Sequence, residues 1–124
     1  MAATCTVVEE RHGSLKKIKW DWKSNSAGAV SIAAAETTHA YNGALERFVT
    51  VPDGGGAAPS ASYDCTVLDQ DSTDTLMGGG SSRATAATEQ VKAASLGVVA
   101  NDKLKLVVAN AGASNAGIAY LYLR

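Results

Sequence analysis

Two strand-like runs in the C-terminal part of the chain constrain its fold more than any other feature. Residues 102–108 and 117–124 are rich in Leu, Val, Ile and Tyr, and a connection of Ala, Asn, Gly and Ser at residues 109–116 separates them. β-Branched and aromatic residues favour strands, whereas Asn, Gly and Ser favour turns. A strand that runs to the last residue must pair its backbone groups with something. We therefore expect this end of the chain to belong to the core sheet.

Period-two alternation predicts further strands. The clearest is at residues 17–23, where the apolar side chains of Ile18, Trp20 and Trp22 alternate with charged ones. Less regular runs predict strands at residues 4–11, 29–33, 44–51 and 63–69, and residues 75–77 form a short apolar run. A turn at residues 24–28 would join the tryptophan strand to the next one as a hairpin. The Ala-rich residues 83–95 are expected to be extended, with a single helical turn near residues 84–88.

Short strands separated by Gly-rich turns predict an all-β fold. We expect about seven to eight antiparallel strands, arranged as an antiparallel β-sandwich or jelly roll with Gly-rich loops. A parallel α/β arrangement is disfavoured because no helical pattern of crossover length joins the strands. A chain of 124 residues is expected to form a single domain, residues 1–124.

Composition and the N-terminal residues disfavour several classes of partner. The chain has 11 basic and 12 acidic side chains, so it lacks the positive field that draws proteins to nucleic acid. No apolar segment approaches the roughly 20 residues that span a bilayer, and residues 1–5 lack the pattern of a signal peptide. We expect no nucleic-acid or membrane partner and synthesis in a cytoplasm. Cys5 and Cys65 are expected to be reduced core residues rather than a disulfide.

The sequence contains no recognisable catalytic site. His12 and His39 are the only histidines, and both lie in predicted turns. Catalysis needs a positioned acid, base or nucleophile, and no nucleophile signature accompanies either histidine. We therefore expect turn histidines on the surface, no catalytic residues, no cofactor and no enzymatic activity.

Two loop segments match ligand sites only in part. Asp69, Asp71 and Asp74 lie in one predicted bend. Hard cations such as calcium prefer several oxygen ligands supplied by a bending backbone. The spacing departs from an EF-hand loop, and Asx turns account for Asp71 and Asp74 without a metal. Residues 78–82 are Gly-rich but lack the Gly-Lys-Ser/Thr ending of a phosphate loop. No metal site is expected, and a flexible loop is favoured at residues 78–82.

The tryptophan strand raises two alternatives to core packing. Lysines interleaved with aromatic residues can stack nucleic-acid bases, but Trp20 and Trp22 share the apolar face with Ile18 while most lysines face away. Packing in the core is therefore favoured. A solvent-exposed aromatic platform would instead indicate a carbohydrate-binding jelly-roll module. The candidate residues for such a platform are Trp20, Trp22, Tyr41 and Tyr63.

A pattern of strands and turns carries a resemblance to a known class of proteins. It comprises residues 10–22, 45–52 and 63–69 and a closing strand that ends at Leu123 and Arg124. The pattern spans most of the chain and contains no catalytic motif. It resembles the small β-rich virion structural proteins of tailed bacteriophages, of the capsid decoration or cement type.

The resemblance implies a structural role on the virion. A decoration or cement protein would assemble in the host cytoplasm, bind the outer surface of the phage head and stabilise contacts between major capsid subunits. Its partners would be the major capsid protein and further copies of itself in a homo-oligomer. A head-completion, tail or collar protein is the alternative within the same class, and the copy number per particle distinguishes the two.

The segments least committed to predicted strands are hypothesised to make the capsid and subunit contacts. These are the N-terminal residues and the loops at residues 53–62 and 78–87. The residues assigned to the contacts are Met1, Ala2, Ala3, Thr4, Asp53, Gly54, Gly55, Gly56, Pro59, Gly78, Gly79, Gly80 and Arg83.

Overall fold

The computed structural model describes residues 2–124, so Met1, one of the predicted contact residues, lies outside the described residues. The strands are β1 (Thr4–His12), β2 (Leu15–Lys23), β3 (Tyr41–Pro52), β4 (Asp64–Leu68), β5 (Glu89–Lys92), β6 (Val98–Asp102), β7 (Lys105–Ala109) and β8 (Ala116–Leu123). Two short 3₁₀ helices, η1 (Ala33–Ala35) and η2 (Ala93–Ser95), complete the elements of this range. The prediction of an all-β, antiparallel fold is confirmed, with eight strands in residues 2–124.

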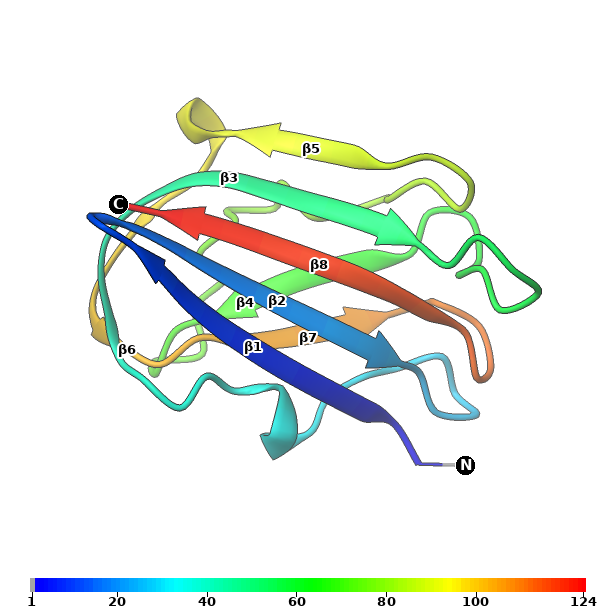
Figure 1. Cartoon of the computed structure of the whole chain (residues 1–124). Coiled ribbons are helices and arrows are strands. Elements are labelled where there is room, and N and C mark those ends of the chain that lie inside the picture. Colours follow the sequence, from blue (N-terminus) through cyan, green and yellow to red (C-terminus); the bar gives the residue numbers. More distant parts are fainter. Residues whose placement is uncertain (1) are drawn as a thin grey trace.

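One large sheet contains most of the strands. Its order is β1-β2-β8-β3-β5, β6 pairs with the first part of β3, and every pair is antiparallel. The C-terminal strand β8 lies between β2 and β3 (Figure 1). Beyond β8, Arg124 exchanges two backbone hydrogen bonds with Ala44, of 2.9 and 3.0 Å. The expectation that this end of the chain belongs to the core sheet is confirmed.

A two-stranded sheet of β4 and β7 forms a second layer behind the large sheet (Figure 1). Isolated bridges attach the connecting segments to this layer. Val30 and Val108 exchange two backbone hydrogen bonds of 2.9 Å, and Glu36 forms a bridge with Lys105. The second layer is therefore completed by segments that have no strand of their own.

The core lies between the two layers. On β2, Ile18, Trp20 and Trp22 are buried, as the alternation predicts. The indole N–H of Trp20 donates to Ala35 O at 2.7 Å, so burial of this polar group is compensated. The ring of Trp22 lies 5.7 Å from that of Tyr63 in the second layer. The prediction that both tryptophans pack in the core is confirmed.

Two local predictions are wrong. Residues 29–33 form no strand and no hairpin with β2, because Val30 makes only a single bridge and η1 begins at residue 33. The single helical turn lies at Ala93–Ser95 instead of residues 84–88, although β5 confirms the extended structure expected within residues 83–95.

The run at residues 102–108 is divided between β6 and β7 instead of forming one strand. Thr37 explains the break: its backbone N–H donates to Leu104 O at 2.8 Å, and its hydroxyl accepts from Leu104 N at 3.0 Å. Leu104 is fully buried, so the break also places an apolar side chain in the core. A long-range polar contact has overridden the local strand preference.

Candidate interaction surfaces

Most of the predicted contact loops meet at one end of the large sheet (Figure 1). We call this end the loop end and define it as residues 2–4, 24–29, 53–62, 83–88 and 110–115. Asp53 N donates to Ala116 O at 3.2 Å, and Ala116 N donates to Ala57 O at 2.8 Å. Ser60 N donates to Ala111 O at 2.9 Å. The loop after β3 is therefore fastened to the connection between β7 and β8.

The two loops predicted as separate contact segments are joined at this end. Thr85 Oγ1 donates to Pro59 O, and Arg83 N donates to Tyr63 O at 2.7 Å. Pro59 is buried, whereas Arg83 is half-buried with its guanidinium 3.8 Å from the carboxylate of Glu89. Pro59 thus supports the loop from inside, and Arg83 connects it to β5.

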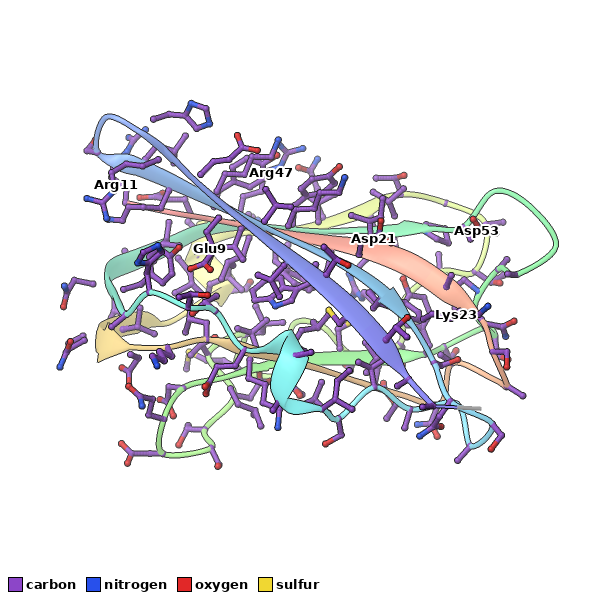
Figure 2. All side chains as sticks on the ribbon, turned by 60° about the horizontal axis from the view of Figure 1, so that its bottom comes forward. Glu9, Arg11, Asp21, Lys23, Arg47 and Asp53 are labelled. Carbon is purple, nitrogen blue, oxygen red and sulfur yellow. The ribbon has the colours of Figure 1, made fainter. Side chains whose placement is uncertain are left out.

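Small residues form the exposed part of the loop end. Ala2, Thr4, Gly54, Gly55 and Gly56 are exposed, and Ala3 and Asp53 are half-buried. A hollow of about 350 Å³ opens beside Asp53 and Gly54, and parts of β2, β3 and β8 line the rest of it. Figure 2 shows Asp53 and Lys23 at this end and Arg11 at the opposite one. The loop end therefore offers a shallow surface into which a partner side chain can reach.

Ser24 fixes the turn after β2 onto the loop end. It is fully buried; its hydroxyl donates to Gly112 O at 2.7 Å and accepts from Asn115 N at 2.9 Å. Gly28 has a φ of +80°, and a Cβ there would lie 2.7 Å from Gly112 N, so only glycine fits this approach. These contacts hold the loop end as one surface instead of a set of independent arms.

The glycines at residues 78–80 have a different place. Cys65 N donates to Gly80 O at 2.8 Å, and a Cβ on Gly80 would lie 2.2 Å from Cys65 O. Gly79 lines a hollow of about 590 Å³ beside β5, together with Arg83. Gly78 is exposed and Gly80 is buried. Gly80 therefore packs against β4 as part of the second layer, and a freely flexible loop is the wrong description of this tract.

The acidic bend is organised by hydrogen bonds to the backbone. Asp69 Oδ1 accepts from Asp71 N and Thr73 N, at 2.9 and 3.0 Å. Asp74 accepts from three backbone N–H groups, those of Val67, Leu76 and Gly78, at 3.2, 3.0 and 2.9 Å. The Asx interpretation is confirmed for Asp74, whereas Asp69 takes the role expected of Asp71. Within residues 2–124, no group of three or more His, Cys, Asp or Glu side chains is arranged to hold a metal ion.

None of the aromatic residues nominated for a carbohydrate platform is exposed. Trp20, Trp22, Tyr41 and Tyr63 are at most 4% exposed. The half-buried aromatic pair is instead Tyr120 and Tyr122, whose rings stack at 6.5 Å on the outer face of the large sheet. The outer face is the face of the large sheet that points away from the core, on the other side of β8 from Leu121 and Leu123.

Two cations cover the tyrosine pair. Lys17 Nζ lies 4.9 Å from the ring centre of Tyr120 and 5.8 Å from that of Tyr122, and the Arg47 guanidinium lies 5.4 Å from Tyr122. These distances fit cation–π contacts. Sequence reasoning missed this group, although the alternation of Leu121 and Leu123 with the tyrosines carried the signal.

A second group missed from sequence surrounds Glu9 on β1. Its carboxylate accepts hydrogen bonds from Thr38 N (2.9 Å), His39 N (3.1 Å) and Tyr41 OH (2.8 Å). Burial acts to raise the pKa of Glu9, but these hydrogen bonds outweigh it and lower the pKa below its ordinary value. Burial also raises the pKa of Tyr41, and its bond to Glu9 adds to the effect. Glu9 therefore ties β1 to the segment before β3.

The two cysteines are free thiols on different sheets. Cys65 on β4 is buried, as predicted, and Cys5 on β1 is half-buried. Burial raises the pKa of each thiol to about 12, with a smaller contribution from Asp21 at Cys5. Because the thiolate is the reactive form, burial disfavours reaction of both thiols near neutral pH.

Comparison with known proteins gives no relative for this arrangement. No protein family matches the chain, and neither a curated protein nor a solved structure is significantly similar to it. Residues 2–124 contain no helix that is long and apolar enough to cross a membrane.

Proposed function

We propose that this protein is a virion structural protein of a tailed bacteriophage, which decorates the outer surface of the head and stabilises contacts between major capsid subunits. The observation that carries the proposal is the convergence of the N-terminal residues with four connecting segments at the loop end. A decoration protein needs a shaped docking surface that is present before binding, because an ordered surface loses less entropy on association. The hydrogen bonds around Ser24 and Ala116 supply that order.

We further propose that the two sheets constitute an open β-sandwich. Support comes from the shared core, which contains Trp20 of the large sheet together with Val67 and Leu106 of the second layer. Two sheets that bury one face each leave their ends and outer faces available for contacts.

The proposal is tested by binding the purified protein to heads assembled from the major capsid protein of the same genome. The informative variant is Gly54→Arg combined with Gly56→Arg, since no atom lies within 4 Å of a Cβ added at either position. We expect head occupancy to fall by about tenfold or more, because bulky charges would obstruct the docking surface. The matched control is Ala94→Arg, an exposed position on η2 that lies away from the loop end.

Undiminished binding by the double variant, or no binding by the unmodified protein, would refute the capsid role of the loop end. Copy number separates the two assignments within the class. Many copies distributed over each particle support decoration. A single ring of copies at one vertex would identify a head-completion, tail or collar protein instead.

A further inference from the structure

The two margins of the large sheet differ in continuity. β1 alone forms one margin, whereas β5 and β6 pair with successive parts of β3 and divide the other margin between them. β1 runs for nine residues, β5 for four and β6 for five. An outermost strand leaves one row of backbone N–H and C=O groups without a partner in the sheet, and the length of the strand sets how many such groups it presents.

β5 carries the features that discourage pairing with another chain. It is short, and its exposed residues Gln90 and Lys92 are polar. Gln90 Oε1 accepts from Arg47 Nε at 2.8 Å, and Glu89 lies near Arg83. Charged side chains and short strands are the usual protections of a sheet edge.

The first half of β1 lacks these two protections. The short helix η1 lies near β1, and its Ala35 O accepts the indole N–H of Trp20 on the core side of the sheet. Residues 4–8 are Thr-Cys-Thr-Val-Val, without a charge or proline. They pair with β2 in continuous register, with no bulge to twist the edge away, and no other strand in the described part of the chain pairs with them. Val8 is 42% exposed. Charges begin only at Glu9, which the segment before β3 already engages.

We propose that the β1 edge is a self-association site, where a second copy of this chain adds its own β1 in antiparallel pairing. The sequence is self-complementary about a two-fold axis at Thr6: Thr6 would lie opposite its counterpart, Thr4 opposite Val8, and Cys5 opposite Val7. This register keeps the exposed side chains of both copies on one face and the half-buried Cys5 and Val7 on the other. Cross-strand Thr and β-branched pairs are favourable, and a two-fold axis closes the interface.

Self-complementarity selects a second copy as the occupant, and charge selects the register. A two-fold axis displaced to Val7 would bring Glu9 opposite Cys5 and Glu10 opposite Thr4, so charges would enter the paired region. The axis at Thr6 leaves five uncharged residues opposite five uncharged residues. This inference rests on the proposed function, because the β1 edge would form the homo-oligomer expected there. Self-association is measured in solution without capsids, so a monomeric result is distinguishable from a failure of capsid binding.

The test is the oligomeric state of the full chain in sedimentation equilibrium, for the unmodified protein and for Thr6→Lys. A lysine on an edge strand opposes pairing with another strand, and two would face each other at the axis. We expect a dimer for the unmodified chain and a weakening of the dimer by about tenfold or more in the variant. Ala94→Lys, which introduces the same charge beside β5, is expected to dimerise as the unmodified chain does.

Disulfide trapping tests the register independently of stability. In a Cys5→Ser background, Thr6→Cys places two thiols opposite each other at the axis, whereas Ser31→Cys places one in an exposed connection. Mild oxidation is expected to link the first variant into a covalent dimer and to leave the second monomeric. A monomeric unmodified chain, a Thr6→Lys dimer of unchanged affinity, or equal crosslinking of both cysteine variants would overturn the proposal.

Discussion

The large sheet and the two-stranded layer behind it are held together by different chemistry. In the large sheet, β2 and β8 pair over nearly their whole length and bury one apolar face. In the second layer, β4 and β7 are short, and the side-chain oxygens of Thr37, Asp74 and Ser24 complete the backbone hydrogen bonds of neighbouring segments. Both sheets contribute buried apolar side chains to the shared core, but the second layer depends in addition on polar groups and close backbone approach.

The largest effect is expected from removing apolar volume beneath the large sheet. Trp20→Ala deletes a fully buried side chain and its hydrogen bond to Ala35 O. We expect the free energy of unfolding to fall by about 3–5 kcal/mol, because a cavity remains where the indole was. Urea denaturation measures the change. Trp20→Phe keeps most of the volume and should lose less. A loss below about 1 kcal/mol for Trp20→Ala would contradict the dependence on apolar volume.

Close backbone approach in the second layer is tested at Gly80. A Cβ there would lie 2.2 Å from Cys65 O, so Gly80→Ala must displace the segment at residues 78–80 from β4. We expect a loss of about 1–3 kcal/mol in the same denaturation experiment. Gly56→Ala is the matched control, because its added Cβ meets no atom within 4 Å. Equal effects of the two substitutions would show that the approach at Gly80 is not a constraint.

The polar groups of the second layer are tested at Asp74. Asp74→Ala leaves the backbone N–H groups of Val67, Leu76 and Gly78 without their carboxylate partner. We expect a loss of about 1–2 kcal/mol, since unpaired donors near the core are costly. The exposed Asp71 of the same bend serves as control, and Asp71→Ala should change stability by less than about 0.5 kcal/mol. The reverse order would contradict the hydrogen-bond assignment.

The same contrast explains how much of the fold could be predicted from sequence. In the large sheet, β2 and β8 were predictable because apolar side chains alternate along them. The buried ones are Trp20, Trp22, Leu121 and Leu123. Residues 29–33 alternate too, yet they form only one bridge, because Gly28 and Val30 bond to Ala111 and Val108, which are distant in the sequence, and not to β2. Contacts between residues so distant in the sequence cannot be read from the local alternation of side chains.

The candidate surfaces were less predictable for a related reason. Gly54–Gly56 are exposed in the loop that follows β3, and a loop was predictable there because these glycines interrupt the strand pattern. Gly80 shares that composition but is buried, because it lies against Cys65, fifteen positions earlier. Glycine tolerates both open loops and tight backbone approach, so its presence alone does not distinguish them.

The smallest expected effect lies at Glu9, where the large sheet meets the polar chemistry of a connecting segment. Its pKa is lowered from an ordinary 4.5 in the folded protein. A carboxyl with a lowered folded pKa contributes stability that is present above the unfolded pKa and is lost as the pH falls through the folded one. We therefore expect the free energy of unfolding to decline below about pH 4.5, and to decline less steeply in Glu9→Gln, which cannot ionise.

Urea denaturation at a series of acidic pH values measures both curves. Tyr41→Phe, which removes one of the three donors, should give an intermediate slope, whereas parallel curves for all three proteins would show that Glu9 does not link β1 to the connecting segment.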